Sequence, residues 1–308
     1  MADPIKLALV GVGKIARDQH VPAIRGEGRF TLAATVDPKG GLPDLPSYTS
    51  LDALLASGDK VDAVTLATPA AGRRDLVAKA LAAGLHVMIE KPPAATLSEV
   101  DDMAELARKA GCVLFTSWHS RGAPFATAAR DWLAARTVSG LRINWREDVR
   151  HWHPGQEWLF GPGGFGCFDP GINALSIATL ILPDPLFIEA AALSVPEGRD
   201  QPIAASLKAR TGGAAGQIEF DIRQTGPQTW DIEVDTDVGT LALREGGAFM
   251  ERPGAAPERA EPREYPSLYA HFADLVASNT PDVDARPLRL VADAFLVAGR
   301  TTVEPFVF

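Results

Sequence analysis

Lys91 is the side chain in this sequence with the clearest setting for chemistry. It follows Glu90 at the end of the apolar run 85–89, and Pro92 and Pro93 stop the strand directly behind it. A lysine in that place is held at the carboxyl edge of a sheet, where open α/β sheets bind ligands. The same side chain could be an ordinary surface lysine beside a turn, so the choice depends on what else reaches that edge.

A glycine fingerprint lies near the N-terminus, directly after the apolar run 5–10. Gly11, Gly13 and Ala16 take the three defining positions of the GxGxxG/A pattern, between a predicted strand and a predicted helix. Gly11 permits the tight turn. Gly13 has no Cβ, so the backbone can approach a pyrophosphate at the helix N-terminus, where unpaired N–H groups favour anions. The pattern indicates a dinucleotide site.

Asp37 is a second signal for the same site. It ends the apolar run 30–36, and an acidic side chain at the end of the second strand suits the ribose hydroxyls of NAD. The carboxylate would repel a 2′-phosphate, so NAD is favoured over NADP, with Lys39 as a partial offset. The alternative is that Asp37 and Pro38 only begin a turn. Because both signals occur in register, a dinucleotide site is the better interpretation.

Alternating strands and helices would bring these residues together. Further strands are predicted at 61–67, 85–89 and 112–117, with helices at 76–83 and 97–110 between them. Parallel strands joined by right-handed helical crossovers form a doubly wound sheet, and their carboxyl ends share one edge. The strand-end residues that would meet there are Gly11, Asp37, Thr68, Lys91 and His119.

The second half of the chain has a different pattern. One helix, at 123–135, precedes runs that alternate in polarity as half-buried antiparallel strands do. Helices at 268–277 and 288–299 follow, and 252–264 is expected to be an exposed loop. The predicted strands are 138–148, 186–195, 204–208, 216–222, 229–234 and 240–243.

We therefore predict an α/β protein with two domains. Residues 1–120 are expected to form a Rossmann domain with a doubly wound parallel sheet. Residues 121–308 are expected to form an α+β domain with a large open, mainly antiparallel sheet.

A second concentration of polar residues precedes a helix predicted at 174–182. The glycine-rich run 161–166 leads to Asp169, and Asn173 shares a face with Asp169 if the helix has begun by then. Asp169 could instead be a helix N-cap followed by Pro170. A cap accounts for Asp169 alone, and explains neither Asn173 nor the glycine-rich approach.

Aromatic residues and histidines cluster just before that run. Trp145, Trp152 and Trp158 could offer indole rings to the apolar face of a sugar, with core packing as the alternative for each. His151 and His153 flank Trp152 and would point the same way on a strand. No third ligand stands at metal-like spacing, so no metal site is predicted.

Composition narrows the function classes. The 308 residues are 46% hydrophobic and 22% charged, an ordinary globular balance in a chain longer than one core usually grows. A net charge of −9 and a pI near 5.2 disfavour nucleic acid and anionic membranes as partners. The sequence lacks a signal-peptide pattern and any apolar run of about 18 residues, so a cytoplasmic protein without a membrane span is expected.

These motifs together resemble those of the Gfo/Idh/MocA oxidoreductases. The resemblance covers essentially the whole chain and rests on Gly11 to Ala16, Thr68-Pro69, Glu90-Lys91-Pro92, the glycine-rich run and Asp169-x-x-x-Asn173. It implies a Rossmann domain, an open-sheet domain, NAD or alternatively NADP as cofactor, and a homodimer through the exposed face of the open sheet. The residues that it places at the cofactor are Gly11, Gly13, Lys14, Ile15, Asp37, Thr68, Pro69, Glu90, Lys91 and His119.

Within that family the chain is most similar to the bacterial aldose 1-dehydrogenases that act on L-arabinose and D-galactose. It departs from the general family pattern at two positions. Asn173 stands where many members carry a histidine, and Arg73 lies near the place of a second histidine usual after Thr-Pro. An asparagine is expected in the aldose 1-dehydrogenase branch. Because it cannot take up a proton, Lys91 or Asp169 would be the base.

The resemblance implies oxidation of the C1 hydroxyl of a pyranose to the aldonolactone, with D-galactose, L-arabinose and D-fucose as candidate substrates and hydride transfer to the nicotinamide. Lys91, Asp169 and Asn173 are the expected catalytic residues. The expected sugar contacts are Lys91, His119, Glu147, Trp152, His153, Asp169 and Asn173. Two alternatives stay open: a regulator that binds NAD and sugar without turnover, and a dehydrogenase for another carbon of a sugar or inositol.

Overall fold

The computed structural model describes residues 3–308, which form two compact units. The first unit runs to His119 and also includes Glu264–Ala285, while the second contains Ser120–Arg263 and Arg286–Phe308. The expected boundary near residue 120 agrees with this division. The expected continuous domain 121–308 does not, because Glu264–Ala285 packs with the first unit.

The first unit is built on a six-stranded sheet in the order β3-β2-β1-β4-β5-β6. Every neighbouring pair is parallel, and this order is that of the doubly wound dinucleotide-binding fold. The five predicted strands are present, and β3 is a short additional edge strand. The strands are β1 (Ile5–Val10), β2 (Phe30–Val36), β3 (Ser47–Tyr48), β4 (Ala63–Leu66), β5 (His86–Ile89) and β6 (Leu114–Thr116).

Helices connect these strands, as the sequence pattern predicts. The helix after the glycine turn contains a π-helical segment, Ala16–His20, before α1. Helix α4 has a complete capping box between Thr96 and Glu99 and ends at Gly111 in the left-handed region. The helices of this unit are α1 (Val21–Gly26), α2 (Leu51–Ser57), α3 (Arg73–Ala82), α4 (Leu97–Ala110) and α8 (Glu264–Ser278).

Helix α8 completes the core of the first unit. Tyr269 and Phe272 are fully buried, and the ring of Phe272 stacks on that of Phe30 with centroids 5.6 Å apart. Burying one large apolar side chain stabilises a fold by roughly 1.5–3 kcal/mol. This gain explains why the helix joins the first unit although it follows every strand of the second unit except β15 in the sequence.

The second unit contains a nine-stranded sheet in the order β14-β13-β12-β11-β7-β10-β9-β8-β15. Its pairs are antiparallel except β7 with β10 and β8 with β15, so the predicted open, mainly antiparallel sheet is confirmed. The strands are β7 (Val138–Arg146), β8 (Leu186–Pro196), β9 (Ala204–Thr211), β10 (Ala214–Asp221), β11 (Thr229–Thr236), β12 (Gly239–Arg244), β13 (Phe249–Glu251), β14 (Glu258–Arg259) and β15 (Ala298–Val303).

Three local expectations for this half are wrong. The expected loop 252–264 contains β14 and the start of α8, and the expected helix 288–299 ends early because β15 begins at Ala298. His151 and His153 do not share a strand, because Asp148 caps a short helix, α6 (Val149–Trp152), by accepting the Arg150 N–H.

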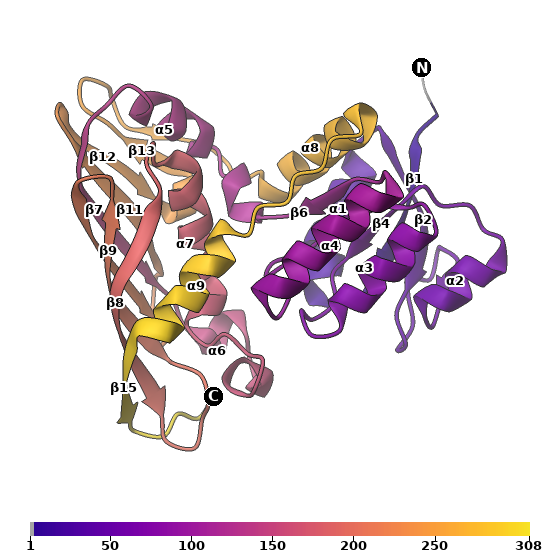
Figure 1. Cartoon of the computed structure of the whole chain (residues 1–308), viewed down its shortest axis with the longest axis horizontal. Helices are drawn as coiled ribbons and strands as arrows, with labels where there is room; N and C mark the ends of the chain where they lie inside the picture. Colours follow the sequence, from indigo (N-terminus) through magenta and orange to yellow (C-terminus); the bar gives the residue numbers. More distant parts are fainter. Residues whose placement is uncertain (1–2) are drawn as a thin grey trace. The chain divides into compact units, whose positions relative to one another are not determined.

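Helices cover one face of this sheet (Figure 1). Helix α7 lies against β7 and β11, and α9 lies against β8. The helices are α5 (Ala126–Leu133), α6, α7 (Phe168–Ile181) and α9 (Arg286–Val297), with short 3-10 turns at His119–Gly122, Glu157–Phe160 and Glu245–Gly247. Among residues 3–308, no helix is long and apolar enough to cross a membrane.

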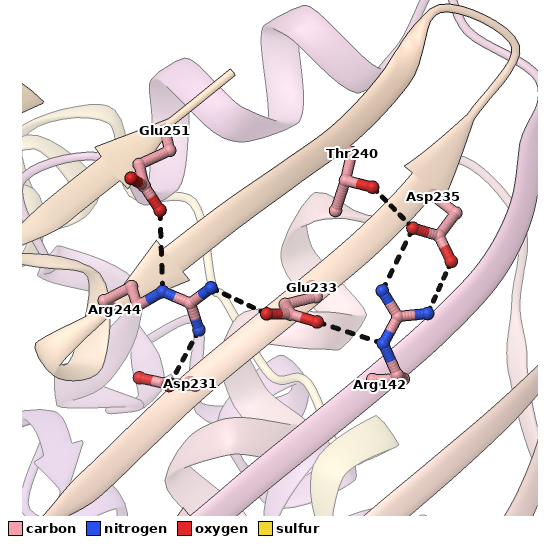
Figure 2. A network of polar contacts seen from close by, with 7 residues as sticks. All are labelled: Arg142, Asp231, Glu233, Asp235, Thr240, Arg244 and Glu251. Atoms are coloured by element: carbon pink, nitrogen blue, oxygen red, sulfur yellow. Dashed lines mark hydrogen bonds and ion pairs between the residues drawn. The ribbon is translucent and has the colours of Figure 1, made fainter. Parts of the chain in front are cut away.

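The other face of the sheet carries a network of paired charges (Figure 2). Two arginines, from strands that pair with opposite sides of β11, stand between carboxylates. Arg142 of β7 contacts Glu233 and Asp235, and Arg244 of β12 contacts Glu233 as well. We call this set the charge ladder; its members are Arg142, Asp231, Glu233, Asp235, Thr240, Arg244 and Glu251.

Candidate active site

The glycine fingerprint forms a tight turn against the end of β4. Gly11 has a φ of +88°, and a Cβ there would lie 2.9 Å from the carbonyl carbon of Ala67, so only glycine fits. A Cβ placed on Gly13 would meet no atom within 4 Å. The backbone at Gly13 therefore borders open space, as close approach to a pyrophosphate requires.

Asp37 connects the end of β2 to this turn. Its Oδ2 accepts the Val12 N–H at 2.8 Å, and its Oδ1 accepts the Lys39 N–H at 2.8 Å. The bond to the Lys39 N–H forms the turn that the alternative interpretation expected. The bond to the Val12 N–H shows that the carboxylate also faces the fingerprint. Each oxygen has a further lone pair, so both can still accept from ribose hydroxyls.

Thr68 brings an unsatisfied polar atom to the fingerprint. Its Oγ1 is buried without a hydrogen-bond partner, and its Cγ2 would lie 3.1 Å from a Cβ on Gly11. Buried hydroxyls are rarely left unpaired unless a ligand or water completes them. The unpaired Thr68 hydroxyl and the open space at Gly13 are what a site for a bound dinucleotide requires. Nearby, Pro69 and Ile15 are exposed, and Lys14 is exposed and paired with Asp18.

Glu90 is a buried carboxylate at the end of β5. Its Oε1 accepts from the Tyr265 hydroxyl at 2.9 Å and lies 3.2 Å from His20 Nε2, while its Oε2 accepts the Lys91 N–H at 2.7 Å. Burial alone would raise the pKa of Glu90. The hydrogen bond and charge of His20 act the other way, as do the charges of His119 and Lys91, and the pKa falls to about 2.

Buried aromatic residues from α8 surround this carboxylate. The ring of Tyr265 stacks on His119 with centroids 5.4 Å apart. The Tyr269 hydroxyl lies 2.7 Å from His20 Nδ1 and donates to Thr65 Oγ1 at 3.3 Å. Burial raises the pKa of Tyr265 and of Tyr269 well above the ordinary range, so both hydroxyls remain hydrogen-bond donors.

Sequence reasoning missed His20, Tyr265 and Tyr269. One signal was available for His20. It occupies the inward face of the first helix with Ala16 and Ile24, at helical spacing among small and apolar residues. A polar side chain on such a face needs a buried partner. No comparable signal identifies the tyrosines, because their partners lie far away in sequence.

Asp169 and Asn173 share one face of α7, as predicted. The helix begins at Phe168, earlier than expected, with Cys167 as its N-cap. Asp169 therefore lies inside the first turn, and the interpretation of Asp169 as the cap is wrong. Its buried carboxylate lies 3.4 Å from His153 Nε2, at the helix end where the dipole favours a negative charge.

The glycines of this segment allow α7 to pack closely on the sheet. A Cβ on Gly171, in the first turn of α7, would lie 2.7 Å from the ring of Phe220 on β10. Gly166 has a φ of +52°, and a Cβ there would lie 2.1 Å from the carbonyl oxygen of Pro202. The contacts of Gly171 with Phe220 and of Gly166 with Pro202 fix the position of the start of α7, and therefore the position of Asp169.

The tryptophans divide between core and surface. Trp145 is buried and stacks on Trp230 with centroids 5.6 Å apart, so the core interpretation holds for it. Trp152 is 40% exposed, and its ring centroid lies 5.3 Å from that of Trp230. Trp158 is 55% exposed. The Trp230 indole, which sequence reasoning did not single out, donates to the buried carboxylate of Glu147 at 2.9 Å.

His153 lies after α6, with its Nδ1 3.3 Å from Gln156 Oε1, while the ring of His151 packs edge-on against Trp152. Within residues 3–308, no group of three or more His, Cys, Asp or Glu side chains is arranged to hold a metal ion. The second unit thus brings Asp169 against His153, and Glu147 and Trp152 against Trp230.

Known proteins resemble the whole chain. A family described as "Oxidoreductase family, NAD-binding Rossmann fold" (Gfo/Idh/MocA) matches residues 5–117. The galactose 1-dehydrogenase of Pseudomonas fluorescens is 46% identical over 98% of this chain and 99% of its own length. A D-galactose-1-dehydrogenase protein from Rhizobium etli has a crystal structure with 50% identity and a TM-score of 0.95, covering 100% of this chain and 99% of that chain.

More distant relatives share less. The D-glucoside 3-dehydrogenase of Escherichia coli is 27% identical over 80% of this chain and 69% of its own length. The crystal structure of GenD2 from gentamicin A biosynthesis, in complex with NAD, is 21% identical with a TM-score of 0.81 over 96% of this chain and 95% of that chain, a likeness of fold alone.

Proposed function

We propose a function for this chain from its family, since it belongs to the Gfo/Idh/MocA oxidoreductases and its first unit is an NAD-binding Rossmann domain. The proposed reaction is oxidation of the C1 hydroxyl of a pyranose to the aldonolactone. The observation that carries the proposal is the 46% identity with a galactose 1-dehydrogenase across nearly the full length of both proteins. D-Galactose is accordingly the first candidate substrate, followed by L-arabinose and D-fucose.

NAD, when bound, supplies the hydride acceptor at C4 of its nicotinamide. The chain must then orient the sugar and remove the proton of the C1 hydroxyl. We propose Lys91 or Asp169 as the group that takes this proton. The Asn173 amide can donate and accept hydrogen bonds to sugar hydroxyls, but it cannot serve as a base.

The remaining site residues have proposed binding roles. Glu147, His153 and His119 offer polar groups to sugar hydroxyls, and Trp152 offers an exposed indole face to the C–H face of the ring. On the cofactor side, we propose that the Asp37 carboxylate binds the ribose hydroxyls and disfavours the 2′-phosphate of NADP.

The test is an assay of the purified protein with NAD and a panel of aldoses, in which NADH absorbance is followed. D-Galactose, L-arabinose and D-fucose should be oxidised, with D-glucose and myo-inositol as comparison substrates. The product with D-galactose should be the lactone, and a ketone would show attack at another carbon. NAD binding without oxidation of any of these compounds would contradict the proposal and support a non-catalytic regulator.

For the assembly, we propose a homodimer through the sheet face that carries the charge ladder. That face lies on the side of the nine-stranded sheet that the helices of its own unit leave uncovered. Arg142 and Arg244 already lie beside carboxylates there, so packing against a second copy would not bury them unpaired.

A further inference from the structure

Arg73 is a fully buried cation that the proposed reaction does not use. It is the first residue of α3, directly after Gly72 in the left-handed region, and its side chain is 2% exposed. Arginine is almost never so buried unless it is paired. Among the described residues, Arg73 is the largest side chain that is fully buried, so its contacts require an explanation.

Within residues 3–308, the two terminal guanidinium nitrogens bond only to backbone carbonyls of two turns, and the buried Nε has no partner. Its Nη1 donates to the carbonyl oxygens of Glu90 and Pro92, and its Nη2 donates to the carbonyl oxygen of Thr68. Glu90 and Pro92 are the residues on either side of Lys91, and Thr68 lies in the turn that follows the neighbouring strand β4. One side chain therefore joins the turn of the proposed base to a turn of the cofactor site.

The backbone of Lys91 is consequently held from two directions. The carboxylate of Glu90 accepts the Lys91 N–H at 2.7 Å, and Arg73 binds the carbonyls before and after Lys91. The planar guanidinium offers several donors in a rigid fork, which neither lysine nor histidine reproduces.

Arg73 also places a positive charge beneath this turn. Burial lowers the pKa of Arg73 to about 10, and the negative charge of Glu90 opposes that change. The side chain therefore remains a cation at neutral pH. Its charge-assisted bonds to carbonyl oxygens are stronger than neutral ones. Loss of the guanidinium would leave three turn carbonyls without this donor.

We infer that Arg73 is a positioning residue for Lys91, holding its turn in register with the Thr68 turn so that the Lys91 side chain starts from a fixed backbone. This inference rests on the proposed function in that it takes Lys91 as a residue of the reaction. The alternative is a structural role alone, in which Arg73 stabilises the unit without affecting the behaviour of Lys91.

The experiment compares Arg73→Lys and Arg73→His with wild type in the presence of NAD. Arg74→Met is the matched control, because Arg74 is the adjacent residue of α3 and bonds to exposed Asp102 instead. Both Arg73 variants should lower kcat by about 10- to 100-fold, as small displacements of a reacting group do, with a smaller change in the KM of the aldose. The acid limb of the kcat/KM pH profile, which reports the group that takes up the proton, should also move. Arg74→Met should change neither kcat nor this limb.

A second readout does not depend on turnover. Lysines are methylated with ¹³C, and the Lys91 resonance is identified by its loss in Lys91→Ala. Its titration midpoint should shift by about half a pH unit or more in Arg73→Lys and stay unchanged in Arg74→Met. If wild type oxidises no aldose but this shift occurs, the proposed function fails and the positioning role stands. A folded Arg73→Lys with wild-type kcat, pH profile and Lys91 titration would overturn the inference.

Discussion

At the scale of single residues, the proposed chemistry depends first on the amine of Lys91. In Lys91→Ala we expect kcat to fall by about 10²- to 10⁴-fold, the usual effect of removing a proton-transfer group. NAD affinity should change far less. Lys91→Arg is the matched variant, because it keeps the positive charge but cannot give up a proton near neutral pH. Steady-state kinetics and fluorescence titration with NADH measure the two effects. Wild-type turnover in Lys91→Ala would make Lys91 a bystander.

Cofactor choice is predicted to depend on the charge of Asp37. Asp37→Ser removes the carboxylate that faces the fingerprint turn, so the ratio of kcat/KM for NADP to that for NAD should rise by about 10-fold or more. Asp37→Asn separates charge from geometry, since the amide oxygen can still accept the Val12 N–H. Asp44→Ser, at an exposed acid paired with Arg25, is the control. An unchanged ratio in both Asp37 variants would contradict the proposed NAD preference.

Glu90 should make the stability of the first unit sensitive to acid. Its pKa is about 2 in the folded chain against an ordinary value of 4.5. A lowered folded pKa contributes stability that is present above pH 4.5 and is lost as the pH falls toward 2. The free energy of unfolding in urea should therefore decrease less steeply over this window in Glu90→Gln than in wild type.

Glu105→Gln is the control for that measurement. The pKa of Glu105 is also lowered to about 2 by its hydrogen bond to Arg108, but the group is exposed on α4, where solvent screens the interaction. Its replacement should leave the slope nearly unchanged. Equal slopes in wild type and Glu90→Gln would show that the buried network does not hold Glu90 as a carboxylate.

At the scale of elements, the segment from α6 through Phe160 is held by the C-terminal residues of the chain. The Phe306 ring packs on Phe160 with centroids 5.6 Å apart, and the Arg150 guanidinium lies 4.6 Å from the centroid of Phe306. Arg199 donates to the Phe306 carbonyl at 3.4 Å. Because this segment includes Trp152 and His153, the packing should fix the position of the proposed sugar contacts.

We therefore expect Phe306→Ala to raise the KM of the aldose by about 3- to 10-fold with little change in NAD affinity, since it loosens only the sugar-binding segment. Val307→Ala is the control, because the Val307 side chain is 76% exposed. Kinetics with D-galactose at saturating NAD provide the measurement. A rise in KM of the same size in both variants would show that the effect is not specific to Phe306.

Local sequence patterns predicted the elements that depend on local chemistry. The β-rich runs 5–10 and 30–36, the glycine turn and Asp37 all lie where they were expected. The start of α7 was missed because Pro170 and Gly171 disfavour a helix interior, although proline is tolerated in a first turn. Strand β15 was missed because its pattern continues that of α9.

Residues whose roles come from distant contacts could not be predicted in this way. The burial of Arg73 depends on carbonyls in two other turns, and the roles of Tyr265 and Trp230 depend on Glu90 and Glu147. Such contacts exist only in the folded units, and no spacing within one element indicates them. The candidates Lys91 and Asp169 could therefore be proposed from the sequence. The residues that contact the neighbours of these candidates, such as Arg73 and Tyr265, could not.

At the scale of the whole molecule, the charge ladder should make dimerisation sensitive to charge reversal. Arg142→Glu would set a third carboxylate beside Glu233 and Asp235, so the variant should be monomeric, whereas the wild type should have the mass of two 32.7 kDa chains. Light scattering after size-exclusion chromatography measures the mass. Arg108→Glu, which changes an exposed side chain of α4, should remain a dimer. Wild-type mass in Arg142→Glu would exclude this face as the interface.

The return of α8 to the first unit has a consequence for how the protein is made. All strands of the parallel sheet are synthesised long before Tyr265, Tyr269 and Phe272, which belong to the apolar core of the same unit. During that interval the core around Phe30 lacks the aromatic rings of α8, and Glu90 lacks the hydroxyl of Tyr265. The nucleotide-binding unit is thus completed only after almost all of the other unit has been synthesised, and the unfinished chain exposes apolar surface in the meantime.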